Sequence, residues 1–87
     1  MRRDKSRNPA DRKVTLIGKP GCHLCDRARE VIVRVTGELG VAFEELDITR
    51  DEKLHRSYAE QIPVTLIDGR QHDFWRVDEN RLRKALS

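Results

Sequence analysis

The sequence predicts an α/β fold in which four strands form one mixed sheet with helices on both of its faces. Short aliphatic and β-branched runs alternate with segments whose apolar residues repeat every three to four positions, as in strands and amphipathic helices. The order is strand, helix, strand, helix, strand, strand, helix, with a two-residue hairpin signal between the last two strands. A helical crossover makes the first two strands parallel, and the hairpin makes the last two antiparallel.

The first strand and the first helix are separated by a turn. Residues 13–18 are a strand-like run, and the Lys-Pro-Gly segment 19–21 ends it. From Cys22 onward the apolar side chains share one helical face: Leu24, Ala28, Val31, Ile32 and Val35. Gly37 and Gly40 bracket the end of this helix, because glycine commonly follows the last helical turn.

Residues 41–48 form the second predicted strand, and a short helix follows it. Thr49 and Glu52 have the spacing of a capping box, which predicts that Thr49 is the N-cap of this helix. The apolar residues Leu54 and Tyr58 are four positions apart and should face inward.

A hairpin and a final helix complete the chain. Residues 64–67 and 71–76 are its strands, joined by Asp68-Gly69. Phe74 and Trp75 are adjacent, so we expect them on opposite sides of the last strand, one in the core and the other partly exposed. Asp78 is the predicted N-cap of a helix that runs through Leu86.

The net charge of +3 is unevenly distributed along the 87 residues. Residues 1–13 carry a net +4 and the remainder a net −1. We therefore expect residues 1–12 to be a disordered basic leader, alternatively a tail that contacts an acidic partner, and residues 13–87 to form the only domain. The body has no basic patch with interleaved aromatic residues, which argues against nucleic acid binding.

No apolar run approaches the roughly 18 residues of a membrane helix, and no signal-peptide region is present. Two cysteines are too few for a secreted disulfide scaffold. These observations predict a cytoplasmic protein that does not bind membranes, and we expect it to be a monomer without a resident cofactor.

Both cysteines lie in one Cys-x-x-C motif, Cys22-His23-Leu24-Cys25, at the predicted start of the first helix. Three-residue spacing on a helix brings the two side chains to one face, within reach of a disulfide. A helix N-terminus carries unpaired N–H groups and a partial positive charge, which stabilise a thiolate at Cys22. Lys19 adds a nearby cation. Cys25 lies one turn further and is expected to be more buried, which suits a resolving thiol.

Other interpretations of the motif remain open. A structural disulfide is weak, because so short a loop removes little entropy from the unfolded chain. Unreactive thiols are a second alternative. A zinc site would need two of His23, His55 and His72, but their spacing lacks the H-x₃₋₅-H pattern. His23 either favours the thiolate when protonated or is a solvent-facing residue of the first helical turn.

The segment Gly18–Cys25, followed by Ile62-Pro63-Val64 and Asp68-Gly69, resembles the glutaredoxins of the thioredoxin-fold superfamily, and in particular small bacterial glutaredoxin-like proteins with Leu before the second cysteine. The resemblance covers residues 13–87 and has the element order predicted above. It implies a thiol–disulfide oxidoreductase with Cys22 as nucleophile and Cys25 as resolving thiol.

The resemblance also implies further site residues. Pro63 would be a cis-proline facing the cysteines, with the Ile62 backbone pairing with an extended substrate or with glutathione. Lys19 would meet the glycyl carboxylate of glutathione, and Asp78 would lie near its γ-glutamyl end. The paired glycines that usually follow the hairpin are replaced by residues 72–75, so glutathione remains a candidate co-substrate beside other protein or small-molecule disulfides.

A second class of function is consistent with the same residues. The domain could keep the fold and bind a partner without turning over disulfides. Replacing both cysteines with serine separates the two classes, because a pure binding module keeps its partner.

Overall fold

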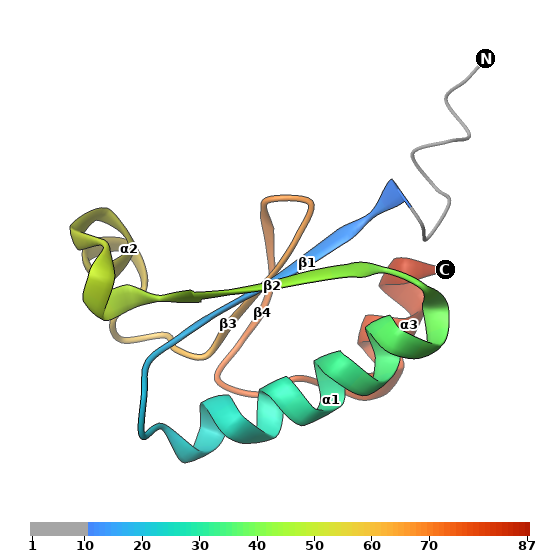
Figure 1. Cartoon of the computed structure of the whole chain (residues 1–87), viewed down its shortest axis with the longest axis horizontal. Helices are drawn as coiled ribbons and strands as arrows, with labels where there is room; N and C mark the ends of the chain where they lie inside the picture. Colours follow the sequence, from blue (N-terminus) through green and yellow to red (C-terminus); the bar gives the residue numbers. More distant parts are fainter. Residues whose placement is uncertain (1–10) are drawn as a thin grey trace.

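A computed structural model describes residues 11–87; the first ten residues of the expected leader lie outside the described part of the chain. Its elements follow the predicted order (Figure 1). They are β1 (Lys13–Gly18), α1 (His23–Leu39), β2 (Ala42–Asp47), the short 3₁₀ helix η3 (Ile48–Arg50), α2 (Glu52–Tyr58), β3 (Val64–Ile67), β4 (Arg70–Phe74) and α3 (Glu79–Leu86).

The four strands form one mixed sheet in the order β2-β1-β3-β4. β1 pairs with β2 in parallel, from Lys13 opposite Ala42 to Gly18 opposite Asp47. β3 lies antiparallel to β1 and to β4. The long helix between β1 and β2 is the crossover that parallel pairing requires. The predicted α/β fold class, with one four-stranded mixed sheet, is therefore confirmed.

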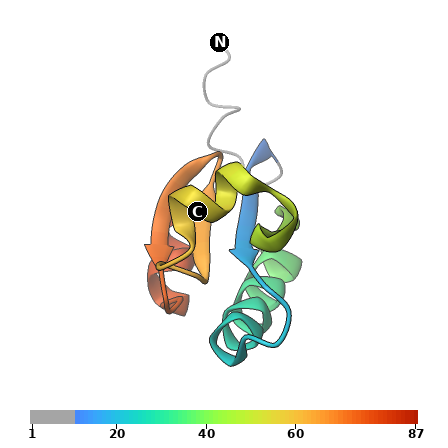
Figure 2. The same ribbon diagram turned by 90° about the vertical axis from the view of Figure 1, so that its left-hand side faces the viewer.

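Helices cover both faces of the sheet (Figures 1 and 2). α1 and α3 lie against one face, where alternate strand residues such as Val14 and Leu16 meet Ile32 and Leu82 in the larger core. α2 lies against the other face, over a smaller core around Ile17. Strand side chains alternate between faces, so β1 contributes to both cores. Because only a short turn separates them, the C-terminal end of β1 and the N-terminal end of α1 meet at one end of the sheet.

Two predicted helix boundaries are confirmed. Asp78 is the N-cap of α3 and accepts a hydrogen bond from the backbone N of Arg81 at 3.1 Å. Gly40 ends α1 in the left-handed region, with φ of 72°, where glycine carries no steric cost. Gly37, by contrast, lies inside the helix.

The capping box predicted at Thr49 is wrong. Asp47 caps η3, and Asp51 caps α2 by accepting hydrogen bonds from the backbone N of Lys53 and of Leu54. The Thr49 hydroxyl instead donates to Asp47. A carboxylate accepts more strongly than a hydroxyl, so the two aspartates on either side of Thr49 take the capping positions.

The expectation that Phe74 and Trp75 face opposite sides of the last strand is also wrong. β4 ends at Phe74, and Trp75 adopts the left-handed region with φ of 65°, so the strand alternation stops between them. Both side chains are exposed, by 43% and 53%, and their rings pack edge to face with centroids 4.9 Å apart.

Within residues 11–87, none of the helices has both the length and the apolar character needed to span a bilayer.

Candidate functional site

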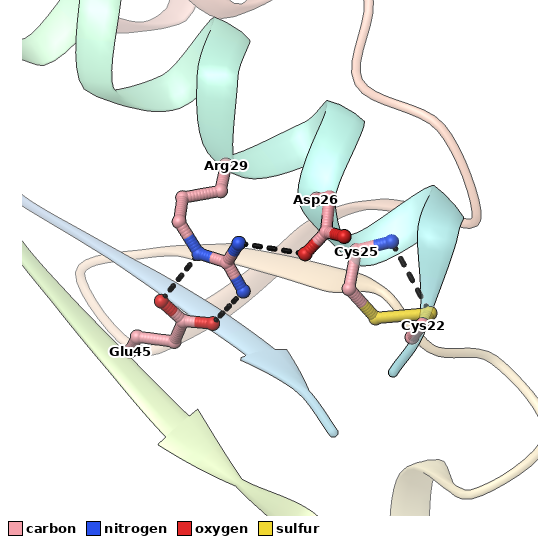
Figure 3. The surroundings of a disulfide bond; sticks show 5 residues. All are labelled: Cys22, Cys25, Asp26, Arg29 and Glu45. Atoms are coloured by element: carbon pink, nitrogen blue, oxygen red, sulfur yellow. Dashed lines mark hydrogen bonds and ion pairs between the residues drawn. A yellow bond between two sulfur atoms is a disulfide. The ribbon is translucent and has the colours of Figure 1, made fainter. Parts of the chain in front are cut away.

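The two cysteines lie where β1 passes into α1, and in this structure they form a disulfide (Figure 3). Their Cα atoms are 5.1 Å apart. Cys22 is the N-cap of α1, and its Sγ accepts a hydrogen bond from the backbone N of Cys25 at 3.2 Å. The sulfur of Cys22 thus takes the place that a capping oxygen usually occupies, facing the positive end of the helix. Such a position favours a thiolate at Cys22 once the disulfide is reduced.

Cys25 is fully buried, whereas Cys22 is partly exposed, as expected from their positions on the helix. Gly18 makes this burial possible. A Cβ atom at Gly18 would lie 2.8 Å from the Sγ of Cys25, closer than such atoms approach in proteins. The end of β1 therefore has no side chain where the second sulfur packs.

A charged cluster borders Cys25 on the β2 side (Figure 3). Arg29 donates two hydrogen bonds to Glu45, at 2.8 and 2.6 Å, and one to Asp26 at 2.8 Å. The bonds to Glu45 and then to Asp26 raise the pKa of Arg29 above its usual value, so it stays charged. Because Asp26 is bound by Arg29, its negative charge beside the dithiol is offset.

Lys19 and His23, predicted near Cys22, are both exposed. Lys19 lies in the turn after β1 and lines a hollow of about 340 Å³ together with Arg29 and Glu45. His23 is the first residue of α1. His23 directly follows Cys22 in the chain, and Lys19 lies three residues before it.

The Ile62–Pro63 peptide bond is cis, as the resemblance implies. Pro63 is buried, and Ile62 packs against the smaller core. Ile17 at the end of β1 pairs with Val64, which places the cis-proline at the same end of the sheet as Cys22. The carbonyl of Pro63 accepts a hydrogen bond from the backbone N of Trp75 at 2.7 Å.

The turn between β4 and α3 carries residues that we did not predict as part of the site. Trp75, Arg76 and Val77 form one wall of a groove of about 450 Å³, and Leu24 and Arg27 of α1 are on the other. Asp78 lines a neighbouring hollow with Trp75 and Arg76, and Lys19 does not line that hollow. A Trp-Arg pair directly after the last strand is the sequence signal that could have indicated this turn.

The three histidines do not gather around the cysteines. Among residues 11–87, no group of three or more His, Cys, Asp or Glu side chains is arranged to hold a metal ion. His55 is exposed on α2, whereas His72 is half-buried in β4. The proposed zinc alternative therefore lacks its further ligands within the described residues.

Residues 13–87 match the family described as glutaredoxin-like domain (DUF836). An uncharacterised protein of Mycobacterium tuberculosis is 36% identical over 80 residues, which cover 86% of this chain and 82% of that protein.

Among solved structures, protein XcR50 of X. campestris is 35% identical, with a TM-score of 0.69 over 84% of this chain and 93% of that one. A mutant thioredoxin from Halobacterium salinarum has a TM-score of 0.68 at 18% identity, covering 95% of this chain and 78% of its own, and shows the fold alone. The extent of the family match, with the dithiol at the start of α1 inside it, shows that the chain belongs to the glutaredoxin-like domain family.

Proposed function

We propose that the protein is a thiol–disulfide oxidoreductase that uses Cys22 and Cys25 as a dithiol. The observation that carries the proposal is the pairing of a partly exposed sulfur at a helix N-cap with a fully buried sulfur one turn further. The first sulfur can be reached by a substrate, and the backbone N–H groups at the helix N-terminus stabilise its nucleophilic thiolate form. The second can be reached only from within the molecule.

The reaction runs in two exchanges. The Cys22 thiolate attacks one sulfur of a substrate disulfide, so that a mixed disulfide forms and the other substrate sulfur leaves as a thiolate. Cys25 then loses its proton and attacks the Sγ of Cys22, which releases the second substrate thiolate. In total the substrate disulfide gains two electrons and two protons, and the dithiol becomes the Cys22–Cys25 disulfide.

An external thiol restores the dithiol by the reverse exchanges, and we propose glutathione as a candidate. Two glutathione molecules supply the two electrons and two protons and leave as glutathione disulfide. In this proposal Lys19 provides positive charge beside the substrate, and His23 lies next to the reacting sulfur. The Ile62 backbone before Pro63 pairs with an extended segment, and Asp78 with the α3 N-terminus lies at the far end of the site.

Equilibration of the purified chain with glutathione buffers of graded redox ratio tests the proposal. We expect a reversible two-electron transition of the cysteine pair between about −270 and −120 mV, the range of redox-active pairs in related folds. Alkylation and mass spectrometry measure the fraction reduced. A pair that stays oxidised down to about −300 mV would be a structural disulfide and would contradict the proposal.

A further inference from the structure

The groove between α1 and the β4–α3 turn, about 450 Å³ in volume, starts at the dithiol motif. Leu24, which lies between the two cysteines in sequence, lines it and is 44% exposed. Ala28 and Val31 continue the same wall along α1. A chain bound in the groove therefore extends from the reactive sulfur along an apolar surface.

The opposite wall is held in place by the cis-proline loop. The backbone N of Trp75 donates to the carbonyl of Pro63 at 2.7 Å, and its indole Nε1 donates to the carbonyl of Glu60 at 3.1 Å. These bonds fix an exposed aromatic ring, so binding there costs little conformational entropy.

The groove also carries positive charge. Arg27 and Arg76 line it, and neither forms an ion pair with another residue of 11–87, whereas Arg29, Arg34 and Arg83 each bind a carboxylate. No acidic side chain lines the groove. The body as a whole carries a net charge of −1, so these cations are a local feature rather than part of a basic surface.

We propose that this groove selects the protein substrates of the dithiol by binding a segment with an apolar side chain and neighbouring acidic residues. Arg27 and Arg76 are its specificity-determining residues. The inference rests on the proposed function, in which a cysteine of the substrate protein forms a mixed disulfide with Cys22. An apolar residue beside that cysteine fills the space between Leu24 and Trp75, and its acidic neighbours meet the two guanidinium groups. Glutathione supplies carboxylates but no large apolar side chain, so it leaves the apolar walls uncovered.

Trp75 reports binding directly, because it is the only tryptophan in the chain and lines the groove. The experiment titrates the oxidised full chain with two capped peptides. Both contain a Leu beside a Ser that replaces the cysteine, and they differ only at two positions, which are Glu in one peptide and Lys in the other. We expect the Glu peptide to change the fluorescence of Trp75 saturably and to bind at least about tenfold more tightly than the Lys peptide. High salt should reduce the difference.

Arg70 provides the matched control. It is exposed and without an ion pair among the described residues, and it lies in the β3–β4 hairpin at the other end of the sheet. Arg27→Gln and Arg76→Gln should each weaken binding of the Glu peptide about three- to tenfold, whereas Arg70→Gln should leave it unchanged. Equal affinity for both peptides, or an equal loss in Arg70→Gln, would overturn the proposal. So would glutathione displacing the peptide at equal concentration.

A second arm separates this proposal from the function on which it rests. In this arm the Ser of each peptide is a cysteine, and that cysteine is joined to a small thiol by a disulfide bond. The reduced chain is mixed with each peptide, and the rate at which the peptide disulfide is reduced is measured. If neither is reduced while Trp75 still distinguishes the peptides, the oxidoreductase proposal fails and the docking proposal stands. If both are reduced at the same rate, the docking proposal fails and the oxidoreductase proposal stands.

Discussion

At the hairpin end of the sheet, where β1 begins and β3 turns into β4, the carboxylate of Asp68 is bound within the chain. Asp68 accepts hydrogen bonds from the Arg12 side chain and from the backbone N of Lys13 at 2.9 Å. At the dithiol end, Arg27 and Arg76 have no ion-pair partner within residues 11–87, and the apolar Leu24 and Trp75 are exposed. The contacts of Asp68 join the hairpin to the start of β1, whereas the dithiol end presents two cations and two apolar side chains to solvent.

Replacement of either cysteine, at the dithiol end, should have the largest effect on the rate of disulfide exchange. We expect Cys22→Ser to reduce disulfide exchange to the rate of buffer alone, because the remaining thiol, Cys25, is fully buried. Cys25→Ser should keep the first exchange and accumulate the mixed disulfide, since the resolving thiol is missing. Mass spectrometry of the trapped species checks both results. Accumulation in Cys22→Ser instead would reverse the assigned roles.

Two glycines test how closely the dithiol end is packed. Gly18→Ala should destabilise the protein by about 1–3 kcal/mol, because the added Cβ meets the Sγ of Cys25. Gly37→Ala, in the last turns of α1, has no atom within 4 Å of the added Cβ and should stabilise by about 0.5–1 kcal/mol. Urea unfolding of both oxidised variants measures the difference. A similar effect at both positions would contradict the tight packing at Gly18.

A substitution at the hairpin end should change stability without changing exchange. Asp68→Asn keeps a residue that tolerates the positive φ of 52° but removes the charge that binds Arg12. We expect a loss below about 1 kcal/mol in the free energy of unfolding, as for other partly exposed ion pairs. The rate of exchange with a model disulfide should equal that of the wild type. A slower rate would show that the two ends are coupled.

His72 lies in β4, between the two ends, and should give a smaller effect that depends on pH. Burial, and then the nearby charge of Arg81, lower the pKa of His72 below 6.5. The unfolded chain therefore binds a proton more readily, so the folded protein loses stability as the pH falls below about 6.5. His72→Gln should remove this part of the loss. Unfolding curves at pH 7.5 and 5.5 provide the comparison, and an identical pH dependence in both proteins would refute it.

Apart from the cap placed at Thr49, the sequence predicted the features that depend on neighbours along the chain. The element order, the cap at Asp78 and the turn at Asp68-Gly69 follow from local patterns, and the structure contains all three. The turn signal works because Asp and Gly both tolerate positive φ. The burial of Cys25 also followed from its place one turn into the helix.

Tertiary contacts decided what the sequence could not predict. Trp75 leaves the strand because its backbone N bonds to Pro63 and its indole to Glu60, residues more than ten positions away. Gly18 is required by a sulfur that only the fold brings beside it. Arg27 has charged neighbours on α1, and it lines the groove because the β4–α3 turn lies opposite it.

The rate at which Cys22 is alkylated as a function of pH tests the central claim most directly. In the reduced full chain, the N-cap position should lower the pKa of the Cys22 thiol below about 7.5. Iodoacetamide should therefore modify Cys22 at pH 6 well before Cys25. A model peptide with a free cysteine is the reference. If the Cys22 rate instead rises with pH as that of the peptide does, with an apparent pKa near ~8.5, the dithiol is not activated and the account is contradicted.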